Sequence, residues 1–100
     1  MRRFAHRNVR DANHTEIVRW YEDLGIGVVD LADVGKGCPD LLVHAFGLCE
    51  LVEIKIAKGL LKQSQEEFMR CWKGNTITVV RTMEDVVAHV KAMAERRKAA

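Results

Sequence analysis

The chain has 100 residues, of which 48% are hydrophobic and 30% charged, and a formal net charge of +2 at pH 7. These values are typical of one soluble globular domain, so we expect a single domain over residues 1–100 with a core at about residues 10–92. The longest stretch without a formal charge, residues 41–49, is far shorter than the ~20 apolar residues that cross a bilayer. No apolar segment follows the first residues, so we expect no secretory signal, no membrane partner and an intracellular, cytoplasmic location.

The cysteines and the basic residues indicate little chemistry by themselves. Three widely spaced cysteines without a CxxC pair predict neither a disulfide framework nor a zinc site. Arginines gather in the first ten residues, and basic residues gather again at residues 96–98. Such clusters can bind phosphates, but on charge alone solvated chain ends are the favoured interpretation.

The first half of the chain predicts one helix and three strands. Apolar residues at helical spacing indicate a helix over residues 12–24, which Gly25 would end. A strand near residues 28–31 and a turn at residues 34–39 follow, since two glycines and the only proline interrupt regular structure there. Residues 40–46 and 49–56 then predict two strands joined as a hairpin at Gly47. The second of these strands should turn Val52, Ile54 and Ile56 to one face and Leu51, Glu53 and Lys55 to the other.

The second half predicts a helix, a strand and a last helix. Ser64 and Glu67 have the spacing of a capping box, so the helix should begin at Ser64 and end near Gly74. Residues 76–80 are β-branched and alternating, which indicates a fourth strand. Thr82 should cap the last helix, whose expected apolar stripe is Met83, Val86, Val87, Val90, Met93 and Ala94. The order α-β-β-β-α-β-α predicts an α/β fold of the α+β sandwich type, in which helices flank a mixed four-stranded sheet. The aromatic residues Trp20, Tyr21 and Trp72 could lie in the core or at an interface, and the core is the expectation.

Asp40, Glu53 and Lys55 form the pattern with the clearest chemistry. Asp40 begins one strand of the hairpin, and the other two residues share a face of its partner strand. Two carboxylates could then bind one Mg²⁺ ion, and the lysine could orient an attacking water and offset negative charge. An ion pair on a solvated sheet face would also explain Glu53 and Lys55. The apolar neighbours of these charges nevertheless favour burial, where a charge needs a partner or a metal.

Two further polar residues could join this group. Glu16 lies just off the apolar stripe of the first helix and could supply a third metal ligand, or it could be an ordinary first-turn glutamate. Gln65 lies on the apolar face of the second helix, where its amide would need a hydrogen-bond partner, or it could be a boundary residue.

Over residues 10–90 the sequence resembles the VRR-NUC branch of the PD-(D/E)XK nucleases, whose smallest, virus-type members are stand-alone domains of about this length. The similar positions are Asp11-Ala12-Asn13, Glu16-Ile17-Val18, Gly25, Val34-Gly35-Lys36-Gly37, Pro39-Asp40-Leu41-Leu42-Val43, Leu51-Val52-Glu53-Ile54-Lys55, Gln65-x-x-Phe68 and Trp72-Lys73-Gly74. The family often has Leu-Thr-Pro before its glutamine, whereas this chain has Leu61-Lys62-Gln63-Ser64, which leaves Gln63 as a rival to Gln65.

The resemblance implies a restriction-endonuclease-like core and DNA phosphodiester hydrolysis that depends on Mg²⁺ or Mn²⁺. It implies metal ligands at Glu16, Asp40, Glu53 and the Ile54 carbonyl, with Lys55 as the catalytic lysine and Gln65 as the motif glutamine. The small size suggests cutting of branched DNA by a homodimer, as in Holliday junction resolvases, without a small-molecule cofactor, and a phage origin is one option. Phosphates would be bound by Arg7, Arg10, Lys36, Lys58 and Lys62.

Two other classes of protein remain possible from the sequence. One is a catalytically inactive nuclease fold that only binds nucleic acid. The other is a small interaction protein in which Glu53 and Lys55 form no more than an ion pair. Metal-dependent cleavage of DNA would separate the nuclease from both.

Overall fold

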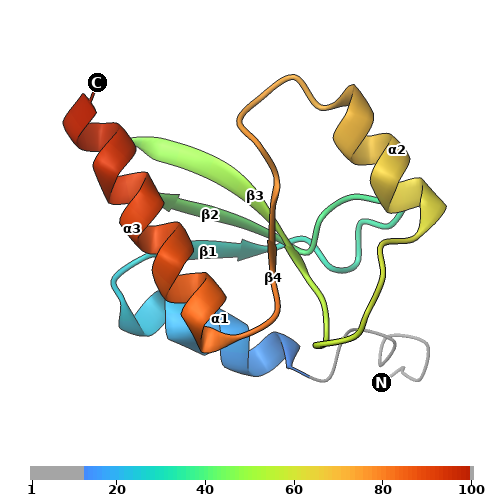
Figure 1. Ribbon diagram of the computed structural model, residues 1–100, viewed down its shortest axis with the longest axis horizontal. Helices are drawn as coiled ribbons and strands as arrows, with labels where there is room; N and C mark the ends of the chain where they lie inside the picture. Colours follow the sequence, from blue (N-terminus) through green and yellow to red (C-terminus); the bar gives the residue numbers. More distant parts are fainter. Residues whose placement is uncertain (1–12, 100) are drawn as a thin grey trace.

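A four-stranded mixed sheet lies at the centre of the protein, with helices packed around it (Figure 1). The structure is a computed structural model that describes residues 13–99, with side chains described as far as residue 97. The predicted α+β class and element order are confirmed. The elements are α1 (His14–Asp23), β1 (Gly27–Asp30), β2 (Leu41–Ala45), β3 (Leu48–Ile54), α2 (Gln63–Cys71), β4 (Thr78–Val80) and α3 (Met83–Ala99).

The strands lie in the sheet in their chain order. β1 pairs with β2 and β2 with β3 in antiparallel fashion, whereas β3 and β4 are parallel. The predicted hairpin is therefore β2–β3. Its two connecting residues, Phe46 and Gly47, both have positive φ values, 56° and 77°. This pair of values belongs to the type I′ turn, whose twist matches that of the flanking strands.

Helices α1 and α3 contact each other and cover one face of the sheet. Their shared position follows from Tyr21 of α1, which bonds to His89 of α3, which in turn bonds to Glu50 of β3. Strand residues that alternate onto this face form the core together with apolar residues of both helices. The fully buried members include Ile17, Tyr21, Leu41, Val43, Val52, Val80, Val86 and Met93.

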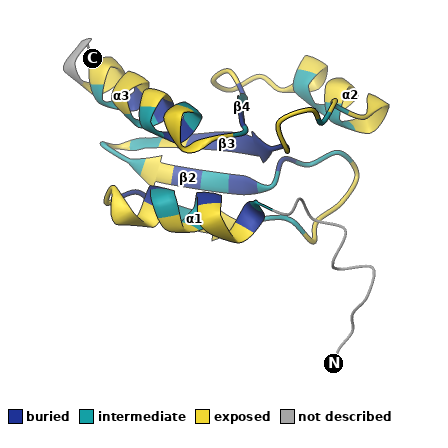
Figure 2. Cartoon of the chain, turned by 60° about the horizontal axis from the view of Figure 1, so that its bottom comes forward, coloured by how far each residue is buried: buried dark blue, intermediate teal, exposed yellow. Residues whose placement is uncertain are grey.

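Helix α2 stands apart from α1 and α3, and none of its residues is buried (Figure 2). It begins at Gln63 rather than at the predicted Ser64, because the Gln65 side chain accepts a hydrogen bond from the Lys62 amide and so caps the helix there. It ends at Cys71, since Trp72 is already extended with a ψ of 130°. The side chain of Trp72 is 41% exposed, so its predicted place in the core is wrong, whereas Tyr21 is fully buried.

The last strand and helix follow the prediction with small changes. Thr82 caps α3 as expected, because its hydroxyl accepts a hydrogen bond from the Asp85 backbone amide at 3.1 Å. Met83 is 49% exposed and does not belong to the buried stripe of α3, since it precedes the part of the helix that lies on the sheet. Ile56 is 47% exposed because β3 ends at Ile54, two residues before it. None of the described helices combines the length and the apolar character that crossing a membrane requires.

Candidate active site

Asp40 and Glu53 face each other across the β2–β3 hairpin. Leu41 pairs with Val52, so the next position outward sets Asp40 opposite Glu53. Residues directly opposed in an antiparallel pair have Cβ atoms about 4.5–5.5 Å apart. Asp40 is also fixed from the neighbouring backbone, because the Ile54 amide donates to its Oδ2 at 2.8 Å. The hairpin therefore brings together the two carboxylates that the sequence predicted, on the sheet face opposite α1 and α3.

Glu53 and Lys55 form a buried ion pair at the end of β3. The Lys55 Nζ atom lies 3.9 Å from Glu53 Oε2, and the two side chains are only 8% and 2% exposed. Removing two charges from water costs several kcal/mol per ion by general estimates, so such a pair is costly unless other groups compensate. The alternative of an ion pair on a solvated sheet face is excluded by this burial.

Gln65 connects α2 to this ion pair. Its Nε2 donates to Glu53 Oε2 at 2.8 Å, while its Oε1 accepts the Lys62 amide at 2.8 Å. Gln63, the rival residue, is exposed, and its amide bonds only weakly to Glu67 at 3.4 Å. Of the two glutamines it is therefore Gln65 that contacts Glu53, with its nitrogen donating to the carboxylate and its oxygen accepting from the backbone.

The glycine-rich turn before Asp40 packs directly on the start of α2. A Cβ atom added at Gly37 would lie 2.2 Å from the Ser64 carbonyl oxygen, so only glycine allows this approach. Cys38, the next residue, lies close enough to the carboxylates to be affected by them. Burial raises the pKa of its thiol, and the negative charges of Asp40 and Glu53 raise it further. Both effects favour the neutral thiol near neutral pH.

Two side chains fix the backbone around Lys55. Asn13 Nδ2 donates to the carbonyl of Lys55 at 3.1 Å and to that of Arg81 at 3.2 Å, which ties the start of α1 to the ends of β3 and β4. Arg81 Nη1 donates to the carbonyls of Ile56 at 2.8 Å and Gly59 at 2.6 Å. These bonds hold the segment after Lys55 and thereby limit where its ammonium group can lie.

The structure does not bring every predicted residue into the site. Within residues 13–99, no three His, Cys, Asp or Glu side chains form a group that could hold a metal ion, so Glu16 does not complete a ligand set with Asp40 and Glu53. Helix α1 turns Ile17 and Tyr21 to the sheet, which leaves Glu16 exposed on another side. The predicted phosphate-binding residues Lys36, Lys58 and Lys62 are exposed, as that role requires, and Arg7 and Arg10 lie outside the described residues.

Sequence reasoning missed a second polar group, which lies inside the core. Tyr21 Oη lies 2.7 Å from His89 Nδ1, and His89 Nε2 lies 2.8 Å from Glu50 Oε1. Arg96 and Asn75 also donate to Glu50. The sequence does place these polar residues at core positions. His89 lies three residues after Val86 on the apolar stripe of α3, and Glu50 alternates with Val52 along β3. All three members are at most 5% exposed, so the group lies in the interior, away from any substrate.

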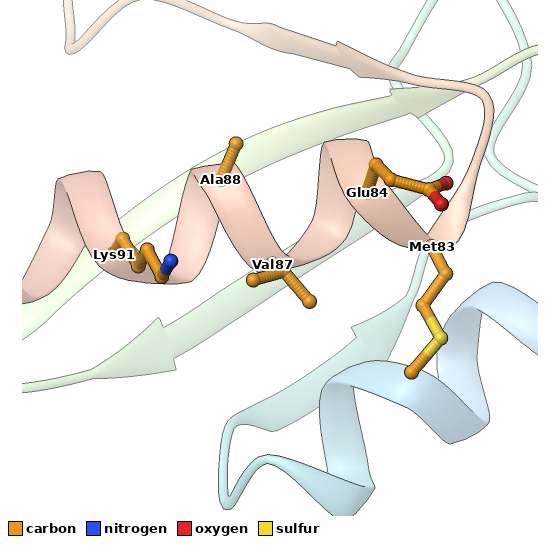
Figure 3. A pocket seen from close by; sticks show the side chains of 5 residues that line it. All are labelled: Met83, Glu84, Val87, Ala88 and Lys91. Carbon is orange, nitrogen blue, oxygen red and sulfur yellow. The ribbon is translucent and has the colours of Figure 1, made fainter.

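A hollow of about 330 Å³ runs along α3, away from the carboxylates (Figure 3). It is lined by Met83, Glu84, Val87, Ala88 and Lys91, and the Met83 side chain points toward α1. All five residues belong to one helix, and they place no convergent set of polar groups around the hollow. The hollow therefore lacks the convergent polar groups that are found around Glu53.

No protein-family model matches the sequence, and neither a curated protein nor a solved structure is significantly similar to the chain. The function therefore has to be inferred from the site itself.

Proposed function

We propose that the protein is a metal-dependent nuclease that hydrolyses DNA phosphodiester bonds with Asp40, Glu53 and Lys55. The observation that supports this best is the buried Glu53–Lys55 pair, which Gln65 contacts and which Asp40 faces across the hairpin. Strongly buried charges gathered at a strand end are costly for stability, and such arrangements cluster at functional sites. The order and spacing of these residues also agree with the resemblance to the VRR-NUC nucleases.

The donor set fits Mg²⁺ or Mn²⁺. Both ions prefer oxygen ligands, and Mg²⁺ is commonly held by one or two carboxylates together with waters and substrate phosphates. Asp40 and Glu53 would supply the carboxylates, and the carbonyl of Ile54 lies in the same backbone segment as Glu53. When bound, the ion would polarise the scissile phosphate and lower the pKa of a water molecule.

Residues of the chain would stabilise the transition state and hold the reacting groups in position. Lys55 would offset the negative charge that develops on the phosphate in the transition state and would orient the attacking water. Gln65 would keep the Glu53 carboxylate in one orientation, since the Lys62 amide holds the glutamine from its other side. Asn13 would fix the backbone of Lys55. A site held from α1, α2 and β2 at once is preorganised for reaction.

Branched DNA cut by a homodimer is the most specific form of the proposal. A two-fold dimer would present two such sites to the two strands of a junction. The exposed Lys36, Lys58 and Lys62 would contact phosphates on either side of the cut. The second candidate function is binding of nucleic acid without cleavage, and it would use the same basic residues.

The test is cleavage of a labelled four-way junction and of its matched linear duplex in Mg²⁺, Mn²⁺ or EDTA. We expect cutting in either metal, none in EDTA, and faster cutting of the junction. The Asp40→Asn variant keeps an oxygen that can accept the Ile54 amide, so it should fold and yet lose activity by about two orders of magnitude or more. Lys55→Met, which keeps an apolar stem in the buried position, should lose activity to a similar extent.

Lys91→Ala serves as the matched control, because Lys91 is exposed on α3 and takes no part in the site. It should cut like the wild type. Metal-independent cutting, or full activity of a folded Asp40→Asn protein, would disprove the assignment. Binding of the junction without cleavage in either metal would support the second candidate function.

A further inference from the structure

An aromatic pair, the half-buried Phe68 and the exposed Trp72, lies at the C-terminal end of α2. Phe68 follows Gln65 by three residues, so these two side chains share one side of α2, and Trp72 comes directly after the last residue of the helix. The two rings are stacked, with centroids 5.9 Å apart and an interplanar angle of 19°. Trp72 is 41% exposed, so part of its ring is accessible to a ligand. The pair therefore begins one helical turn from the residue that contacts Glu53.

The Trp72 ring is held in place rather than free to rotate. Its Nε1 donates to the Asn75 carbonyl at 2.8 Å. A Cβ atom added at Gly74 would lie 2.8 Å from three atoms of the indole, so the glycine backbone packs closely against the ring. An aromatic group fixed in this way loses little conformational entropy when something binds to it.

The charge around the pair matches a nucleic acid. Residues 58–73 carry four basic and two acidic side chains, so this segment alone has a net charge of +2, which equals that of the whole chain. The four basic residues, Lys58, Lys62, Arg70 and Lys73, are all exposed. Phosphates on a positive surface together with bases on aromatic rings are the usual way in which proteins bind single strands.

We propose that Phe68 and Trp72 stack on an unpaired nucleobase next to the bond that is cut, so that the enzyme selects DNA with unpaired nucleotides at the cleavage position. This inference rests on the proposed nuclease function and names the substrate feature that it recognises. A paired base inside a continuous duplex offers no free ring face to the aromatic pair, whereas a base at a branch point, a gap or a flap does. Phosphate contacts by Lys62 and Lys73 would hold the strand on either side.

The experiment uses Trp72 as its own reporter. The chain has two tryptophans, so a Trp20→Phe protein fluoresces from Trp72 alone. A short single-stranded oligothymidine and a blunt duplex of the same length are titrated into it at low salt in EDTA, where no cleavage intervenes. We expect the single strand to quench Trp72 and the blunt duplex to leave its emission nearly unchanged. In a separate assay on otherwise wild-type protein, Trp72→Ala should weaken single-strand binding about 5- to 150-fold, which corresponds to one stacked base. Trp72→Phe should lose less single-strand affinity than Trp72→Ala.

Met83→Ala is the matched control, because it removes a similarly exposed apolar side chain from α3 and should bind like the wild type. Unchanged single-strand affinity in Trp72→Ala, while junction cleavage persists, would overturn this inference and leave the nuclease intact. A failure of every nucleic acid to bind would overturn the inference and the proposed function together. Emission that changes with protein concentration alone would make the pair an interface between copies of the chain, and the inference would again fall.

Discussion

Gln65 of α2 donates its amide to Glu53 of β3 at 2.8 Å, and this bond joins the least buried helix of the described chain to its central strand. The carbonyl oxygen of the same side chain, Oε1, accepts a hydrogen bond from the Lys62 backbone amide at 2.8 Å. One side chain thus fixes the first turn of α2 and orients a carboxylate of the candidate site. Because no residue of α2 is buried, its position must depend strongly on a few contacts of this kind.

Replacement of Gln65 by alanine should therefore destabilise the protein and impair the site. A hydrogen bond to a charged group contributes about 1.5–3 kcal/mol, so the free energy of unfolding in urea should fall by about that amount. Gln63→Ala is the control, since its exposed amide reaches only Glu67, at 3.4 Å, and the loss there should stay below about 0.5 kcal/mol. Equal losses in the two variants would show that the bonds of Gln65 to Glu53 and Lys62 contribute no more to stability than the weak contact of Gln63.

Gly37→Ala should move α2 away from the sheet. The new methyl group would lie 2.2 Å from the Ser64 carbonyl oxygen, and the backbone φ of 79° already disfavours alanine. Gly35→Ala separates these effects, because Gly35 has a nearly identical φ of 77° but no atom within 4 Å of the added methyl. The Gly35 variant should lose about 1 kcal/mol from backbone strain alone, and the Gly37 variant clearly more. Urea unfolding and Trp72 fluorescence would report both changes. If the two variants lose the same free energy of unfolding, the contact between the turn and α2 contributes nothing to stability.

The sequence predicted most of the fold because the deciding signals are local. Alternating β-branched residues mark β4, the turn at Gly47 marks the β2–β3 hairpin, and Thr82 with Asp85 marks the start of α3. Each of these needs only a few neighbouring residues to form. The same hairpin brings Asp40 opposite Glu53, so this half of the site could also be predicted.

The rest of the site depends on contacts between distant parts of the chain. Glu50 and His89 are separated by 39 residues and Tyr21 and His89 by 68, so spacing in the sequence could not reveal their bonds. Glu16 was expected at the carboxylates because it lies near an apolar stripe. The rotation of α1, fixed by Ile17 and Tyr21, instead leaves it exposed.

Asn13 should act as a clamp on β3 and β4 rather than as a helix cap. It occupies the N-cap position of α1, yet its side chain makes no capping bond and donates instead to the carbonyls of Lys55 and Arg81. Asn13→Ala should cost about 1–2 kcal/mol of unfolding free energy. Asn13→Asp should cost more, because it places a carboxylate oxygen against two carbonyl oxygens. Aspartate is a good N-cap, so a fully stable Asn13→Asp protein in thermal or urea unfolding would show that capping, not clamping, is the role of this position.

The buried Tyr21 should make the protein sensitive to alkali. Burial raises the pKa of its phenol, and the negative charges of Glu50 and Asp85 raise it further, so the folded state favours the protonated form. The stabilisation is complete below the ordinary phenol pKa of about 10. It is lost above that pH by up to about 1.4 kcal/mol per pH unit, because the unfolded chain releases its proton first.

At neutral pH, Tyr21→Phe should be about 1 kcal/mol less stable than the wild type, through the lost bond to His89. This difference should shrink as the pH rises above about 9, vanish between about pH 10.5 and 11, and reverse at still higher pH. Tyr21 is the only tyrosine, so the ultraviolet absorbance of its phenolate follows the titration directly. Phenolate formation near pH 10 in a protein that is still folded would contradict the expected upward shift.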